Sequence, residues 1–111
     1  MAVNVRALIA AKQAEAVQTT QYTASGVRTI IDKFTATNVS GSTATISVNL
    51  VTGSDTPGNQ NLITKTKSLA ASEVYTFPEL VGQIMPNTSY ISTIASAASA
   101  INMRVSGREV T

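Results

Sequence analysis

The chain contains no cysteine, no histidine and no tryptophan. Without cysteine it forms no disulfide and offers no thiolate to a metal ion. Without histidine it lacks the commonest general base and the imidazole ligand that zinc sites use most. Two Phe and three Tyr are too few for the stacking platforms that bind single-stranded nucleic acid. Packing and hydrogen bonding must therefore stabilise the fold, and the commonest catalytic chemistries are excluded.

Charge is also sparse. Eight Lys and Arg against six Asp and Glu give a formal net charge of +2, without a run of one sign. This balance is too weak to predict binding to nucleic acid or to a membrane surface. No apolar stretch reaches the ~18 residues of a membrane helix, and the start lacks the pattern of a secretory signal. We therefore expect a soluble protein made in the cytoplasm, with no nucleic acid and no membrane among its partners.

From residue 19 onward the chain is rich in Thr, Ser, Val and Ile, the composition of β-strands. Apolar and polar side chains alternate in residues 43–52 and 101–106, as only the two-residue period of a strand produces. The predicted core positions are Ile46, Val48, Leu50, Ile101, Met103 and Val105. The predicted outward positions are Thr45, Ser47, Asn49, Asn102 and Arg104.

Further strands are predicted elsewhere, separated by turn sequences rich in Gly, Pro, Asn and Ser. In the predicted strand of residues 27–38, Asp32 shares a side with Ile30 and Phe34, so either the register changes there or Asp32 lies at the rim of a sheet. The pattern predicts an all-β domain, an antiparallel β-sandwich or jelly-roll-like barrel of about 6–8 strands. Residues 78–85 begin with Pro and Glu, which predicts one turn of helix. These further strands are residues 27–38, 61–69, 73–77 and 89–95.

The first 17 residues do not follow the strand pattern. Residues 7–17 are rich in Ala and Gln, which favours a short helix, and an extended arm lying on a neighbouring chain is the equal alternative. The chain is therefore divided into residues 1–17, an arm or short helix, and residues 18–111, the β-sandwich domain. Apolar side chains in the first segment have no obvious place in a two-layer core, so we predict that they contact a partner. They are Val3, Val5, Leu8 and Ile9.

Two other features have competing interpretations. Arg104 and Arg108 share a face if their segment is a strand, and they either contact an acidic partner surface or keep a solvent-facing strand from stray pairing. Residues 90–101 carry small and β-branched side chains. This stretch is either an interface that another chain approaches closely or a core strand opposite a bulky layer.

The acidic residues form no catalytic motif. Paired carboxylates can serve a glycosidase, but none of the six is placed in a recognisable pattern. Asp55 and its oxygen-bearing neighbours in residues 53–59 resemble part of a calcium loop, yet one carboxylate makes a weak site, so we expect an ordinary surface loop. We predict no enzyme activity, no catalytic residue, no cofactor and no metal. The six are Glu15, Asp32, Asp55, Glu73, Glu79 and Glu109.

Three segments together resemble small structural proteins of tailed bacteriophages. They are residues 29–38 (TIIDKFTATN), residues 75–82 (YTFPELVG) and residues 104–111 (RVSGREVT). The likeness extends over most of the chain from about residue 20, and its motifs are packing and turn motifs.

The resemblance implies a component of the virion and does not specify its position in the particle. The leading hypothesis is a head decoration or cement subunit that bridges neighbouring capsid proteins. Such a subunit binds the major capsid protein or other virion proteins and is expected to form a homo-oligomer. A collar, head-tail or tail accessory subunit is the alternative, and a receptor- or glycan-binding module of a tail fibre is another.

Overall fold

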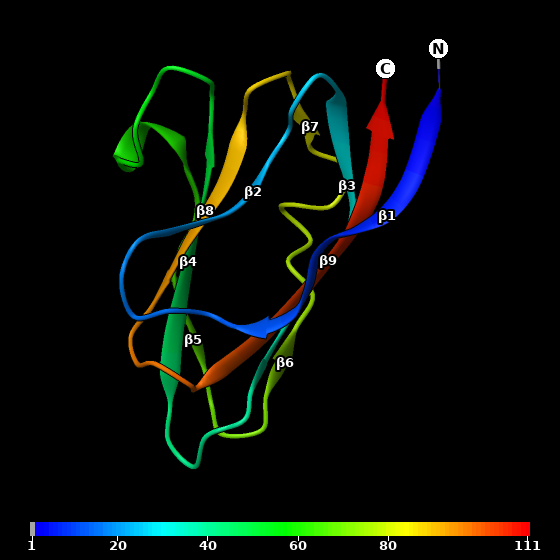
Figure 1. Cartoon of the computed structure of the whole chain (residues 1–111). Coiled ribbons are helices and arrows are strands. Elements are labelled where there is room, and N and C mark those ends of the chain that lie inside the picture. Colours follow the sequence, from blue (N-terminus) through cyan, green and yellow to red (C-terminus); the bar gives the residue numbers. More distant parts are fainter. Residues whose placement is uncertain (1) are drawn as a thin grey trace.

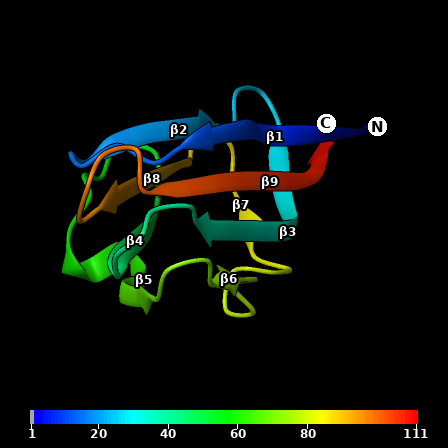
Figure 2. The ribbon, with the colours of Figure 1, turned by 90° about the horizontal axis from the view of Figure 1, so that it is seen from below.

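A computed structural model describes residues 2–111, which form two antiparallel β-sheets packed face to face. Figure 2 shows the sheets as two layers, and this confirms the predicted β-sandwich. The first sheet contains β1 (Val3–Gln13), β9 (Ile101–Val110), β3 (Arg28–Asn38) and β6 (Val74–Tyr75) in that order, and β7 (Ile84–Met85) also pairs with β3. The second sheet contains β2 (Thr19–Thr23), β8 (Tyr90–Ala95), β4 (Ala44–Val51) and β5 (Leu62–Leu69).

The N-terminal segment is neither a helix nor an arm separate from the domain. It is β1, and it pairs along its length with β9 of the same chain. Figure 1 shows β1 running beside β9 at the outer side of the first sheet. Ala has the strongest intrinsic helix propensity, but tertiary pairing overrides propensity here. The predicted boundary at residue 17 therefore does not separate β1 from the sandwich.

The predicted register of the two clearest strands is confirmed. All six predicted core side chains lie on the inner faces of the sheets, and of these only Leu50 keeps partial exposure. Phe34 and Phe77 are fully buried in this core, with ring centroids 4.4 Å apart. A single hydrophobic core therefore joins the two sheets.

Two of the predicted outward positions are wrong. Ser47 and Asn49 are 7% and 3% exposed. Ser47 accepts a hydrogen bond from the Thr66 amide of β5 (2.8 Å), and the loop after β4 folds back over the outer face of the second sheet at Asn49. The Asn49 amide donates to the Gly58 carbonyl (3.1 Å) and to Asn61 Oδ1 (2.8 Å). Buried polar groups need such partners, so the loop can cover this face only because Asn49 is satisfied there. Asn102 and Arg104 are exposed, as predicted.

The register changes at Asp32, as the first of the two alternatives expected. A bulge between Ile31 and Lys33 moves Asp32 to the solvent side, while Ile31 and Phe34 point into the core. One extra residue in a strand produces this reversal.

β8 lies between β2 and β4, which supports the core-strand interpretation of residues 90–95.

The predicted helical turn in residues 78–85 is not formed. The segment makes tight turns, in which the Leu80 and Gln83 amides donate to the carbonyls of Phe77 and Leu80, and it ends in β7. Pairing of Ile84 with Ile30 of β3 extends the first sheet and competes with the helix. The helix described in residues 2–111 is the three-residue 3-10 turn at Asn59–Asn61.

Candidate interaction surface

Five apolar side chains gather on the outer face of the first sheet, at the end where β1 begins and β9 ends. Directly opposite residues in an antiparallel sheet share a face, and the buried positions Val105 and Gly107 fix which face of β9 is the inner one. One row across the sheet reads Val5, Arg108, Ile30, Ile84, and the next reads Val3, Val110, Arg28. The outer patch consists of Val3, Val5, Ile30, Ile84 and Val110.

The outer patch is unusually open for apolar side chains. Val3, Val5 and Ile84 are 57%, 75% and 64% exposed. Ile30, Ile84 and Val110 also line a shallow hollow of about 190 Å³ together with Arg28. Exposed apolar side chains gathered on one face in this way, here around Arg108, typically mark a place where another molecule binds.

The predicted contact residues are divided between the surface and the interior. Val3 and Val5 belong to the outer patch, as expected of partner contacts. Leu8 and Ile9 do not: they are 5% and 3% exposed and lie in the core between the sheets. The bulges of β1 after Ala7 turn both side chains inward, so the prediction that they contact a partner is wrong.

Arg108 crosses the outer patch and is held by Asp32. Its guanidinium makes three hydrogen bonds to the carboxylate, from Nε to Oδ2 (3.0 Å) and Oδ1 (3.2 Å) and from Nη2 to Oδ1 (2.9 Å). Asp32 raises the pKa of Arg108, so this arginine stays charged. Arg104 lies on the same face of β9, exposed, and no ion pair in residues 2–111 involves it. Of the two, Arg104 is therefore the one without an internal acidic partner.

Behind the outer patch, a polar cluster closes the end of the core. The Tyr22 hydroxyl donates to the Glu109 carboxylate and lies 2.8 Å from Thr29 Oγ1, while Arg6 forms an ion pair with Glu109 (3.3 Å). Burial and the neighbouring Glu109 raise the pKa of Tyr22 to about 12. The hydrogen bond from Tyr22, aided by Arg6, lowers the pKa of Glu109. Glu109 is therefore ionised near neutral pH and is unsuited to act as a general acid.

A second carboxylate bridges the sheets at their other side. Glu79 accepts hydrogen bonds from Thr64 of β5 and from the Tyr75 hydroxyl of β6 (2.6 Å). Burial opposes ionisation of Glu79, but these hydrogen bonds and Lys67 outweigh it and lower its pKa. Glu79 in turn raises the pKa of Tyr75 to about 12. Each cluster therefore links different strands through hydrogen bonds between side chains.

In the loop of residues 53–59, the Asp55 carboxylate is already hydrogen-bonded by donors of the same chain. Asp55 accepts hydrogen bonds from the Thr56 amide (2.8 Å), from Gln60 Nε2 (3.2 Å) and from Asn61 Nδ2 (3.3 Å). The Thr56 and Gln60 hydrogen bonds lower the pKa of Asp55. Within residues 2–111, no group of three Asp or Glu side chains is placed to hold a metal ion.

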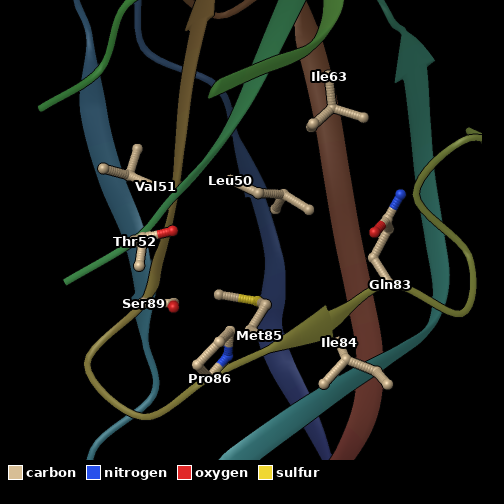
Figure 3. Close-up of a pocket in the computed structure, with 9 residues that line it drawn as sticks. All are labelled: Leu50, Val51, Thr52, Ile63, Gln83, Ile84, Met85, Pro86 and Ser89. Carbon is tan, nitrogen blue, oxygen red and sulfur yellow. The ribbon is translucent and has the colours of Figure 1, made fainter. Parts of the chain in front are cut away.

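A second hollow, of about 200 Å³, lies at the open side of the sandwich. Figure 3 shows Leu50 and Ile63 on one side of it, and Met85 and Pro86 on the other. Ser89 also lines this hollow, and its buried hydroxyl has no hydrogen-bond partner in the described part of the chain. The lining carries no charged side chain, so the hollow offers shape and apolar contact but no reactive group.

Comparison with known proteins does not assign a family, because no family model, curated protein or solved structure matches the chain. No helix in residues 2–111 is long and apolar enough to cross a membrane.

Sequence reasoning found only part of the outer patch. Val3 and Val5 were identified because they precede the strand-rich region, whereas Ile30, Ile84 and Val110 were not. Ile84 lies in a turn-rich segment without alternation, and only its pairing with Ile30 brings it to this face. In the sequence Ile84 and Met85 are simply two adjacent apolar residues, and their opposite burial becomes visible only in the structure.

Proposed function

We propose that this chain is a structural protein of a tailed-bacteriophage virion, a head decoration or cement subunit that binds the major capsid protein through the outer patch. The observation that carries the proposal is the exposed apolar surface formed by Val3, Val5 and Ile84 on a well-packed sandwich. The resemblance of residues 29–38, 75–82 and 104–111 to phage structural proteins supplies the class of partner.

Binding without catalysis is also supported by how the chain uses its partly buried carboxylates. Glu79 and Glu109 each bind a tyrosine hydroxyl and have lowered pKa values. Carboxylates whose pKa is lowered by such hydrogen bonds stay ionised at neutral pH and are poorly suited to donate a proton there. We therefore propose a protein that acts through its surface and not as an enzyme.

A collar, head-tail or tail accessory subunit uses the same kind of surface and remains the alternative within the particle. A glycan-binding module is less well supported, because sugar sites usually present aromatic faces. Tyr22, Phe34 and Phe77 are buried, and Tyr75 and Tyr90 are half-buried.

Incorporation of surface variants into phage particles tests the proposal. Ile84→Lys places a charge in the outer patch and should strongly reduce the amount of protein per particle. Val39→Lys, at an exposed position (52%) beyond the far end of β3, is the matched control and should incorporate normally. Both variants should keep the wild-type melting temperature. Normal incorporation of Ile84→Lys would contradict the role of the patch, and absence of the wild-type chain from particles would contradict a virion function.

A further inference from the structure

The outermost strand of the first sheet has an unpaired edge. β1 pairs with β9 on one side, and in residues 2–111 no strand pairs with its other side. From Val3 to Ala7 the pairing with β9 is regular, and register shifts begin only after Ala7. β1 therefore presents a straight, regular stretch of edge at its beginning.

The hydrogen bonds show which backbone groups face that edge. The Ala2 carbonyl accepts from the Thr111 amide (3.0 Å), so Ala2 faces β9. Alternate residues of an antiparallel strand bond to the same neighbour, so Asn4 and Arg6 also face β9. The N–H and C=O groups of Val3, Val5 and Ala7 consequently point away from the sheet, and among residues 2–111 no hydrogen bond outside the strand ladders involves them.

The hydrogen bonds on the other side of β3 lead to the same assignment of which backbone groups face β9. Ile31 donates to the Gln83 carbonyl (3.1 Å) and accepts from the Gly82 amide (2.7 Å), so Ile31 faces away from β9. Its neighbour Ile30 therefore faces β9 and bonds to Arg108. Because Arg108 is also the partner of Val5, the backbone of Val5 must face the free edge.

This edge lacks the features that usually prevent strands from pairing with other chains. Proteins protect edges with proline, charged side chains (most often lysine), bulges or very short strands. β6 is two residues long, β5 carries Lys65 and Lys67 beside register shifts, and β2 has a shift within five residues. Residues 3–7, with the sequence VNVRA, contain no proline, lysine or bulge. Their one charged side chain, Arg6, is neutralised by its ion pair with Glu109 of the same chain.

We propose that β1 pairs antiparallel with β1 of a second copy of this chain, around a two-fold axis at Val5. Val5 then exchanges both backbone hydrogen bonds with Val5 of the other copy. In this register Val3 lies opposite Ala7, and Asn4 lies opposite Arg6, so apolar side chains meet on one face and no like charges meet on the other. Each Arg6 keeps its own Glu109, with which it is ion-paired at 3.3 Å.

The pairing would also join the outer patches of the two copies into one surface. The row that reads Val5, Arg108, Ile30, Ile84 would continue through Val5 of the second copy into the same row in reverse. This inference concerns the isolated chain and does not depend on a virion function, so the two can fail separately.

Single cysteines test the register, because the chain has no cysteine of its own. Directly hydrogen-bonded residues have Cα atoms about 5.5 Å apart, within disulfide range. Mild oxidation should therefore convert Val5→Cys into a covalent dimer on a non-reducing gel. The two copies of Val3 would be four residues apart along the strands, about 13 Å, so Val3→Cys should form no disulfide and give only the monomer band on the same gel. Equal cross-linking of both variants, or none of Val5→Cys, would overturn the register.

Sedimentation of the untagged full-length chain tests the dimer itself. The wild type should sediment with twice the chain mass of 11.6 kDa, and Val5→Lys should sediment as a monomer. Val74→Lys, exposed on β6 at the opposite edge of the same sheet, should remain a dimer. Ile84→Lys should also remain a dimer, since it alters the face and not the edge. A monomeric wild type, or a dimer lost in Val74→Lys or Ile84→Lys but kept in Val5→Lys, would overturn the proposal.

Discussion

Leu8 packs directly against the backbone of Gly107 on the inner face of the first sheet. A Cβ atom added at Gly107 would lie 2.6 Å from Leu8 Cδ1 and closer still to the Ile30 carbonyl oxygen. The bulge in β1 places Leu8 in this space, so a bulky side chain on one strand is matched by a glycine on the next. Replacing either residue should lower stability: a larger side chain at residue 107 would overlap its neighbours, and a smaller one at residue 8 would leave a cavity.

Gly107→Ala should destabilise the fold by roughly 1–3 kcal/mol, because the added methyl overlaps a backbone oxygen that has little freedom to move. Urea unfolding of the variant measures this loss. Gly41→Ala is the control: an added Cβ there meets no atom within 4 Å, so its stability should stay close to wild type. An unchanged Gly107→Ala would contradict the close packing of β1, β9 and β3.

Ile46→Ala should cost roughly 2–5 kcal/mol, since Ile46 is fully buried and its removal leaves a cavity. Leu50→Ala should cost less, because Leu50 is only partly buried. Both free energies come from the same denaturant titrations. A larger loss for Leu50→Ala than for Ile46→Ala would contradict the burial order along β4.

Strand β4 also shows what the sequence can and cannot predict. Alternation at Ile46, Val48 and Leu50 is a local signal, and it identified the inner face of β4 correctly. Burial of Asn49 on the opposite face depends on Asn61, twelve residues later, and on a loop whose conformation has no periodic signal. Polar contacts made by distant loops are therefore the part of the fold that patterning misses.

β1 illustrates the same limit for the candidate site. Its alanines favour a helix when considered alone, whereas pairing with β9 provides hydrogen bonds and burial for Leu8 and Ile9 that a lone helix would not have. The apolar character of Val3 and Val5 was visible in the sequence. Their position beside Ile84 was not, because it follows from strand pairing across the whole sheet.

Deleting residues 1–17 should unfold the protein. The deletion removes Leu8, Ile9 and Ala14 from the core and exposes one edge of β9. Loss of near-UV circular dichroism and of a cooperative melting transition would show this. A truncated chain that still melted cooperatively near the wild-type temperature would contradict the placement of β1 within the sandwich.

Tyr22→Phe should make stability less dependent on pH at both extremes. The folded pKa of Glu109 is below its ordinary value of 4.5, so its contribution is present above pH 4.5 and is lost as the pH falls further. Tyr22 titrates near 12 in the fold and near 10 when unfolded, so its contribution is present below pH 10 and is lost between pH 10 and 12. Melting temperatures measured across pH should therefore vary less in the variant at both ends.

The flattening should be partial, because Tyr75 and Glu79 form a similar pair that the substitution leaves intact. Tyr90→Phe is the control, since the Tyr90 hydroxyl donates to the Asp55 backbone carbonyl (3.2 Å) and contacts no carboxylate. A Tyr22→Phe variant with the wild-type pH profile would show that the pair does not contribute to stability.

Calcium should not raise the melting temperature, and a chelator should not lower it. The oxygens of Asp55 already accept hydrogen bonds from Thr56, Gln60 and Asn61, so a cation would have to displace these donors. Thermal melts with added calcium or with EDTA measure this directly. A stabilisation by calcium that disappeared in Asp55→Asn would contradict this view of the loop.

The number of copies of this chain in purified phage particles tests the central proposal most directly. Quantitative mass spectrometry against the major capsid protein provides this ratio. A decoration or cement subunit predicts a copy number comparable with that of the capsid protein, and a far smaller number would indicate the collar or tail alternative. Absence of the chain from particles that are otherwise complete would contradict a structural role in the virion.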